Sequence, residues 1–297
     1  MGALTPKVIL FKSLGGVLEA LPERLDGWLA TGIARNVGRA TLTSRSHLRN
    51  NLLRALNAPT GSLSEELLER FCDRAYESYG QYWAEGAKLP ALTTESVTSR
   101  FRVSEGLEYL RGAKDLGRGV IVALPHVGSW EWGARYLGHI GLPVTAVAEA
   151  LEPPELFEWF QEKRHAMGLT IKPLDASAGT AIMGTLKAGG VVALLCDRDI
   201  QNNGIEVEFF GEIVTMPAGP ATIALRTGAA LLTAACYAGP GRGHHAVMNK
   251  PLEVERTGRL RDDVQRITQE IARQLEWLIQ RAPEQWHVLQ PRFAEKM

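Results

Sequence analysis

Titratable side chains follow three short apolar runs of the sequence. His126 follows residues 119–125, Glu149 follows 143–148, and Asp197 and Arg198 follow 191–196. Apolar, β-branched runs of this length are typical of strands that are buried on both faces of a parallel sheet. Because open α/β sheets bind ligands at the carboxyl ends of their strands, we predict that these four side chains line one cleft.

The chemistry that this cleft supports depends on His126. Glu131 lies five residues further on, in a helix expected to begin near Ser129, within plausible reach of the imidazole. A neutral imidazole held by a carboxylate acts as a general base. Glu149, at the end of another strand, is an equally good partner for the ring. Free backbone N–H groups near Gly128 and Ser129 would stabilise an oxyanion.

The motifs that would supply a protein nucleophile or a metal are absent from the sequence. It contains no Gly-x-Ser-x-Gly elbow, P-loop or His-Glu-x-x-His motif, and its three cysteines match no metal or redox spacing. We therefore expect no metal and no bound cofactor, and we expect His126 to activate a hydroxyl group of the substrate. Ser129 as a nucleophile is the weaker alternative, because a serine at a helix start is already explained as a cap.

The alternation of strand-like and helix-like segments along the sequence predicts an α/β fold with a mostly parallel central sheet flanked by helices. Residues 1–90 have helical patterns, with Ser64 as the cap of a long helix, and we expect them to form an N-terminal layer on an α/β core of residues 100–297. Further helices are predicted at 129–141, 153–168, 178–190, 215–229 and 261–281, and further strands at 170–174 and 230–238. No linker divides the chain, so 1–297 is predicted to be a single domain.

Charge and hydropathy indicate which partners to expect. The formal net charge is zero, which argues against a nucleic-acid partner, and no apolar run is long enough for a membrane span. Residues 1–57 nevertheless carry a net charge of +5 and apolar residues at helical spacing. A basic amphipathic segment of this kind docks on an anionic membrane, or it packs on the protein with its arginines in solvent. We expect a monomer.

Several segments together resemble a known family. The segment "HVGSWE" at 126–131 is similar to the His-x-x-x-x-Asp/Glu box of glycerolipid and lipid A acyltransferases. The other segments that carry the resemblance are "RNNLLRAL" (49–56), "YESYGQYWAEGAKLP" (76–90), "VAEALEPPELFEWFQEKR" (147–164), "CDRDI" (196–200), "VEFFGEIVTMPAGPATIALRTGAALL" (207–232) and "PEQWHVLQP" (283–291). In this order they resemble the actinobacterial phosphatidylinositol mannoside acyltransferases, a branch of the lipid A lauroyl/myristoyl acyltransferase superfamily.

This resemblance implies an enzyme that transfers a fatty acyl group, typically palmitoyl, from acyl-coenzyme A. The implied acceptor is the 6-hydroxyl of a mannose in a phosphatidylinositol mannoside, and the implied location is the cytoplasmic face of the plasma membrane, with peripheral attachment. It also implies that His126 is the base, that Glu149 orients it, and that Arg164 and Arg198 are polar residues of the cleft. Glu131 matches the acid of the box.

Two positions depart from the family pattern. The box ends in Glu131 where relatives often have Asp, and Asp197 stands where many have Glu, which puts its contact with the catalytic group in doubt. With Arg164, Arg198 and Ser129, we assign Asp197 to substrate binding. The alternatives to this function are an acyltransferase acting on another glycolipid or a lysophospholipid, a thioesterase, and a non-catalytic lipid-binding protein.

Overall fold

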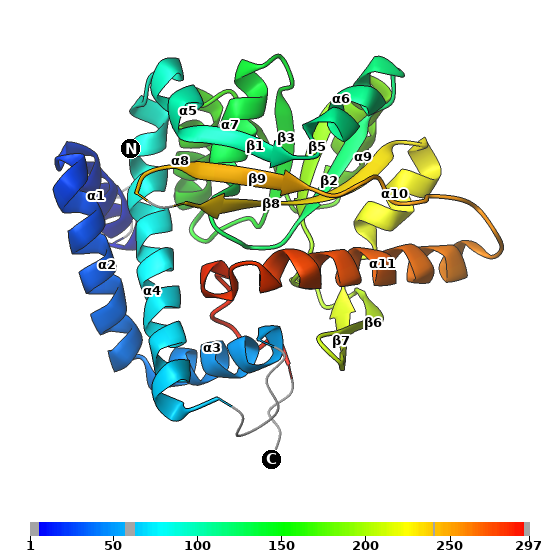
Figure 1. The fold of residues 1–297 in the computed structure, drawn as a ribbon. Coiled ribbons are helices and arrows are strands. Elements are labelled where there is room, and N and C mark those ends of the chain that lie inside the picture. Colours follow the sequence, from blue (N-terminus) through cyan, green and yellow to red (C-terminus); the bar gives the residue numbers. More distant parts are fainter. Residues whose placement is uncertain (1–5, 57–62, 240, 294–297) are drawn as a thin grey trace.

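A seven-stranded sheet with helices on both faces forms the centre of the computed structural model, which describes residues 6–56, 63–239 and 241–293 (Figure 1). The strands follow the order β1-β9-β8-β2-β5-β3-β4 across the sheet. Their bounds are β1 Phe101–Glu105, β2 Val120–Leu124, β3 Val144–Ala148, β4 Thr170–Pro173, β5 Val191–Leu195, β8 Ala230–Ala238 and β9 His244–Met248.

Most of this sheet is parallel, as predicted. Strands β8, β2, β5, β3 and β4 run in one direction, whereas β9 is antiparallel to β8 and β1 runs parallel to β9. Strand β5 lies between β2 and β3, although it follows β3 in the sequence. The end of β2 therefore has the end of β5, and not that of β3, as its neighbour.

The two faces of the sheet are covered by different helices. Along β2, Ile121 and Ala123 pack into the core beneath α9, α10 and α11, while Val120, Val122 and Leu124 pack into the core beneath α6 and α7. This alternation follows from the period of two along a strand. The helices of the α/β part are α5 Thr94–Arg100, α6 Leu107–Asp115, α7 Trp130–His139, α8 Pro154–Ala166, α9 Ala178–Lys187, α10 Gly219–Thr227 and α11 Leu260–Gln280.

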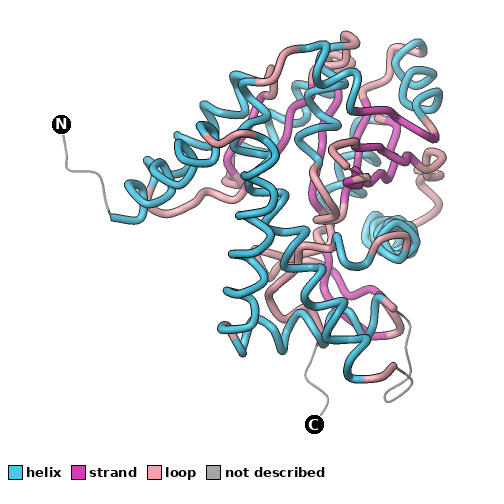
Figure 2. Tube along the Cα trace, turned by 60° about the vertical axis from the view of Figure 1, so that its left-hand side comes forward, coloured by secondary structure: helices cyan, strands magenta, loops and turns pink. Residues whose placement is uncertain are grey.

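The N-terminal part is a layer of helices, as predicted. It consists of α1 Pro6–Ala20, α2 Glu23–Ala40, α3 Leu42–Ala55 and the long α4 Glu65–Lys88, which begins where Ser64 Oγ accepts a hydrogen bond of 3.2 Å from the Leu67 N–H. Helices α2 and α4 lie side by side (Figure 1), and in the turned view of Figure 2 long helices stand outside the strands. Short 3₁₀ turns at Leu89–Ala91 and Pro283–Gln285 complete the elements.

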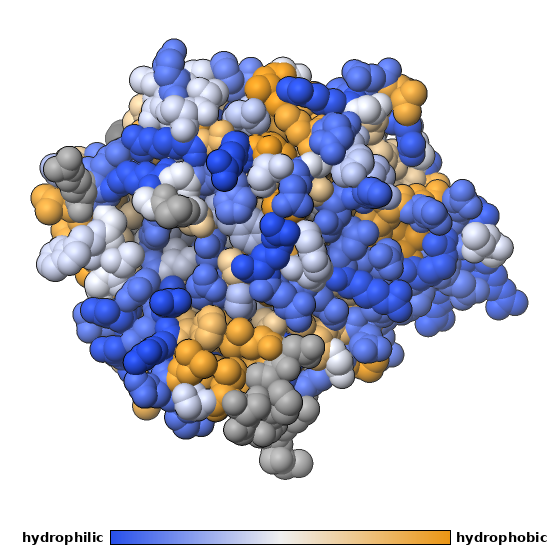
Figure 3. Space-filling model, viewed as in Figure 1, coloured by the Kyte–Doolittle hydropathy of each residue, from blue (hydrophilic) through white to orange (hydrophobic). Residues whose placement is uncertain are grey.

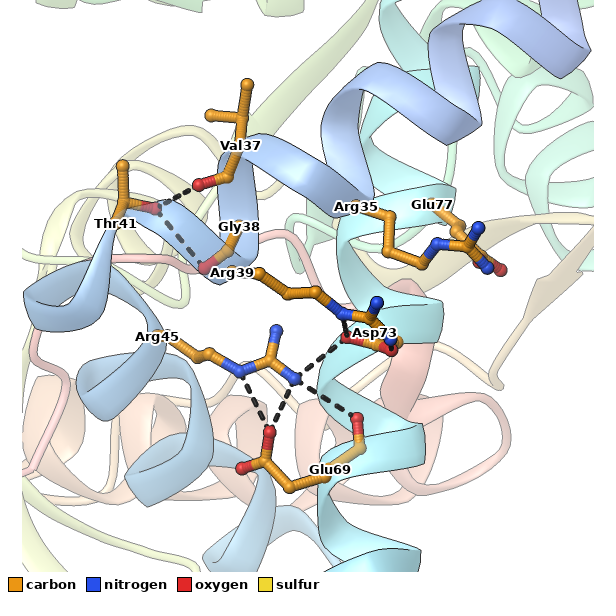
Figure 4. Close-up of polar contacts among 9 residues, drawn as sticks. All are labelled: Arg35, Val37, Gly38, Arg39, Thr41, Arg45, Glu69, Asp73 and Glu77. Atoms are coloured by element: carbon orange, nitrogen blue, oxygen red, sulfur yellow. Dashed lines mark hydrogen bonds and ion pairs between the residues drawn. The ribbon is translucent and has the colours of Figure 1, made fainter.

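Arginines of α2 and α3 hold this layer together by pairing with acids of α4 (Figure 4). Arg45 Nη2 lies 2.5 Å from Glu69 Oε2 and 2.8 Å from Asp73 Oδ1, and Asp73 also pairs with Arg39. Arg35 pairs with Glu77, Arg49 with Glu65, and Arg54 with Glu212. We call these contacts the arginine clasp. The excess positive charge expected to face a membrane is thus largely neutralised within the protein.

One predicted helix begins later than expected. Residues 205–216 form a hairpin of β6 Ile205–Phe209 and β7 Glu212–Met216, so that Thr215 lies in a strand and caps no helix. Helix α10 starts only at Gly219. The sequence does carry the period-two pattern of these strands, because the buried residues Val207, Phe209, Val214 and Met216 alternate with the exposed residues Glu206, Glu208, Ile213 and Thr215.

The surface is polar over most of the face shown in Figure 3, with apolar atoms gathered near α3 at its lower edge. Within the described ranges, we find no helix with the length and hydropathy needed to cross a membrane. Exposed apolar side chains are concentrated on the first helices: Ile9, Val17, Leu25, Trp28, Ile33, Val37 and Leu42.

Candidate active site

His126 and Asp197 form a hydrogen-bonded pair at the ends of β2 and β5. Leu124 and Leu195 are register partners in these neighbouring strands. His126 and Asp197 each lie two residues further along the chain, so the register brings them together. His126 Nδ1 lies 2.6 Å from Asp197 Oδ1, and the backbone N–H of His126 donates to Oδ2 at 3.0 Å. The carboxylate therefore holds both the ring and the backbone of His126.

The environment of Asp197 keeps this carboxylate ionised, which determines the tautomer of a neutral His126 ring. Its side chain is fully buried, and burial alone would raise its pKa; the charge of His126 and hydrogen bonds from His126 and Trp286 instead lower the pKa to about 2. An ionised carboxylate only accepts hydrogen bonds, so the proton of a neutral imidazole must be on Nδ1. Nε2 is then left with its lone pair available as a base.

The His126 ring lines a cavity of about 630 Å³, and 23% of its side chain is exposed. One part of the cavity wall is aromatic and consists of Tyr79, Tyr82, Trp83, Trp130 and His287. Another part is aliphatic and consists of Val147, Ile182, Leu194 and Ile223, which belong to or pack on the core beneath α9 and α10. A cavity of this size with separate aromatic and aliphatic walls is suited to a ligand with two chemically different ends.

The expected partners of the His126 ring were wrong. Glu149 is exposed at the cavity, where it makes no hydrogen bond to His126, because β5 separates its strand β3 from β2. Asp197 was assigned to substrate binding, yet it is completely buried behind the ring and does not line the cavity. The shorter aspartate side chain does reach the His126 ring.

Glu131, the acid of the box, instead holds Arg164. Its Oε1 accepts hydrogen bonds of 3.0 Å from both Arg164 Nη2 and the Tyr82 hydroxyl. Burial by itself lowers the pKa of Arg164, but Glu131 and Tyr82 outweigh this effect and raise it. The guanidinium also lies over the ring of Trp130. Glu131 thus fixes the shape of the cavity wall and does not touch the His126 ring.

The turn after His126 offers no free oxyanion donors at the two predicted positions. The N–H of Gly128 donates to the Gln285 carbonyl and that of Ser129 to the Cys236 carbonyl. Gly128 has φ of +56°, and a Cβ atom there would lie 2.1 Å from the Cys236 oxygen. Ser129 is buried and absent from the cavity wall, so its assignment to substrate binding was also wrong. It occupies the N-cap position of α7, as expected, but its hydroxyl makes no cap hydrogen bond.

Arg198 lines the cavity as predicted, and none of the described acids forms an ion pair with it. Because Arg164 is paired with Glu131, Arg198 is the arginine in this wall whose charge is available to a ligand. Guanidinium groups bind phosphate and carboxylate oxygens well.

His287 is a second histidine of the cavity; the sequence left open whether it flanks the cleft or packs near the C-terminus. Its Nε2 lies 2.9 Å from Ser78 Oγ, and its ring contacts those of Tyr79 and Tyr82 at centroid distances of 5.5 Å. Burial, followed by the charge of His126, lowers the pKa of His287 to about 3, so it is neutral at ordinary pH. In the sequence, Leu67, Phe71, Ala75 and Tyr79 recur at helical spacing, and this apolar stripe could have indicated the cavity wall. Such stripes, however, more often belong to the hydrophobic core.

A strand-end histidine that is oriented by a buried acid, in a cavity with an aliphatic wall, is the arrangement of an acyl-transfer site. Residues 7–295 match the family of bacterial lipid A biosynthesis acyltransferases, so the chain belongs to this family of acyltransferases. It is similar to the phosphatidylinositol mannoside acyltransferase of two Mycobacterium tuberculosis strains, with 35% identity over 250 residues, or 83% of this chain and 76% of theirs. The Mycolicibacterium smegmatis enzyme of the same name is 33% identical over 279 residues, or 93% of this chain and 86% of its own.

Proposed function

We propose that this acyltransferase moves a fatty acyl group, palmitoyl by preference, from acyl-coenzyme A to the 6-hydroxyl of a mannose in a phosphatidylinositol mannoside. The observation that carries the proposal is the His126–Asp197 pair, which directs an unprotonated ring nitrogen to a cavity with aromatic and aliphatic walls. The names of the mycobacterial relatives support this acceptor.

In the proposed reaction, His126 Nε2 removes the proton of the mannose hydroxyl as its oxygen attacks the thioester carbonyl. Asp197 stabilises the imidazolium that forms. When the tetrahedral intermediate collapses, the C–S bond breaks, and the imidazolium returns the proton to the sulfur of coenzyme A. The products are the acylated lipid and the free thiol, and the histidine is again neutral.

The two walls of the cavity suggest where each substrate binds. We place the acyl chain along the aliphatic wall of Val147, Ile182 and Ile223, where burial of methylene groups is favourable. The sugar of the acceptor is placed against the aromatic wall, next to Tyr79 and His287. Arg198 is assigned to an anionic group of either substrate.

A single coupled assay tests this function. Purified protein with palmitoyl-coenzyme A should release coenzyme A only when phosphatidylinositol mannoside is added, with acylated lipid formed in equal amount. Release at full rate without acceptor would instead indicate a thioesterase, and tight lipid binding without any turnover would indicate a lipid-binding protein. Transfer to a lysophospholipid or another glycolipid in preference to the mannoside would contradict the proposed acceptor.

We also propose that the protein associates peripherally with the cytoplasmic face of the plasma membrane through its first helices. The support for this is their exposed apolar side chains, of which Trp28 is 73% exposed. The arginine clasp leaves less free positive charge than the sequence suggested, so we expect apolar contacts to dominate. The side chains of Lys7, Phe11, Leu14 and Arg24, which formed part of the predicted docking segment, lie outside the described residues.

Replacing Trp28 with serine should weaken binding to phosphatidylcholine vesicles that contain phosphatidylinositol by about tenfold or more, because an interfacial indole ring would be lost. Co-sedimentation measures the binding. Leu116→Ser is the matched control, since this side chain is 75% exposed but lies at the end of α6. Equal losses for the two variants, or no loss for Trp28→Ser, would rule out docking through α2.

A further inference from the structure

A C-terminal strap, residues 285–288, crosses the turn that carries His126. The Gly128 N–H donates to the Gln285 carbonyl at 2.9 Å, and the His287 N–H donates to the His126 carbonyl at 2.8 Å. Between these bonds, Val127 and Trp286 form an antiparallel bridge. The strap thus fixes the backbone on both sides of residue 127.

The side chain of Trp286 reaches from this strap to the acid of the catalytic pair. Its Nε1–H donates to Asp197 Oδ2 at 2.8 Å, and Trp286 is only 1% exposed. Oδ2 also accepts the backbone N–H of His126, which leaves Oδ1 to accept the ring N–H at 2.6 Å. Trp286 therefore helps to determine which oxygen of Asp197 faces the imidazole.

Aromatic neighbours hold the indole in this position. Phe209 and Phe210 of the β6–β7 hairpin and Phe293 near the C-terminus surround it at centroid distances of 6.2, 5.9 and 6.5 Å. Trp286 is not among the residues that line the cavity. It can affect the reaction only through the residues that it holds.

We propose that Trp286 is a positioning residue for acyl transfer, which aligns the Asp197 carboxylate with the His126 ring through its indole N–H. This inference rests on the proposed role of His126 as the base. Without the indole N–H, the buried carboxylate loses a charge-assisted hydrogen bond, and Oδ2 is held by the His126 backbone N–H alone, so the alignment of the carboxylate with the ring is less well fixed. Its negative charge also acts more strongly on the imidazolium.

Two kinetic effects follow for Trp286→Phe. The kcat should fall by about tenfold, as expected for one lost hydrogen bond to a charged group, while KM for both substrates stays unchanged. The acid limb of the pH–rate profile should move to higher pH, because the less neutralised carboxylate retains the proton on His126. The other titratable groups near the pair, His287 and Arg292, are left in place.

Trp132→Phe is the matched control. Trp132 is also buried, at 2% exposure, and stacks on His244, but its indole N–H has no partner among the described residues. This variant should lose comparable packing without a shift of the pH profile. In an Asp197→Asn background, Trp286→Phe should lower kcat by less than about twofold, whereas a purely structural role would give the full loss again.

Nuclear magnetic resonance of protein labelled with ¹⁵N-histidine tests the proposal independently of activity. The Nδ1–H signal, assigned to His126 by its loss in His126→Gln, should shift in Trp286→Phe and remain unchanged in Trp132→Phe. If Trp286→Phe does not fold, benzothienylalanine at position 286 replaces the N–H group with sulfur, keeps the bicyclic ring and should give the same shift. An unchanged Nδ1–H signal overturns the positioning role. If the signal shifts as expected but the wild-type protein transfers no acyl group, the proposed function is overturned and the positioning role of Trp286 is not.

Discussion

Replacing His126 with glutamine is expected to lower acyl transfer by about 10²–10⁴-fold, the usual contribution of a general base. Glutamine keeps the polarity and approximate size of the side chain but cannot take the proton of the acceptor hydroxyl. We expect the loss in kcat and not in KM, because His126 acts on the reacting atoms. The measurement is release of coenzyme A with mannoside present, with the fold checked by circular dichroism.

The matched control for this variant is His139→Gln, at the C-terminal end of α7, outside the cavity wall. It should retain the wild-type rate. A folded His126→Gln protein with near-normal turnover would remove the basis of the proposed mechanism.

Asp197→Asn should have an effect of similar size, about 10³–10⁴-fold in kcat, although this residue cannot touch either substrate. Asparagine can offer its amide N–H to Nδ1 and so favour the tautomer whose Nε2 carries the proton and cannot act as a base. Because the pKa of Asp197 is lowered to about 2, its ionisation should not limit wild-type activity at any ordinary assay pH. Steady-state kinetics across the pH range provide the measurement.

Glu149→Gln tests one of the two acids, Glu131 and Glu149, between which sequence analysis could not choose as the partner of the His126 ring. It lies at the cavity without a hydrogen bond to His126, so its loss of kcat should be far smaller than that of Asp197→Asn. A larger effect at position 149 than at 197 would show that Glu149 rearranges to hold the ring when substrate binds.

The strands that precede the candidate site residues were predictable because each is a short apolar run in the local sequence. Strands β1, β6 and β7 were not among the predicted strands. The apolar runs before His126, Glu149 and Asp197 are all strands, and two of these three side chains line the cavity. The pairing of His126 was not predictable, because it depends on the order of strands. Nothing local to β5 indicates that it inserts between β2 and β3, and this insertion selects Asp197 as the partner.

Other failures have the same physical origin in contacts between distant parts of the chain. The N–H groups of Gly128 and Ser129 are used by residues more than 100 positions away, so their local environment at a helix start was misleading. The charge of Arg39 and Arg45 appeared free in the sequence because Asp73 lies in a different helix. Local patterns identified the elements, and tertiary pairing determined which groups remain available.

The close approach of Gly128 to the Cys236 carbonyl limits how this enzyme can vary. Any larger amino acid at this position would push apart two segments that together support the turn of His126, and its positive φ would be strained as well. We therefore expect substitutions that alter substrate preference to fall in the cavity walls, and Gly128 to be retained in this turn.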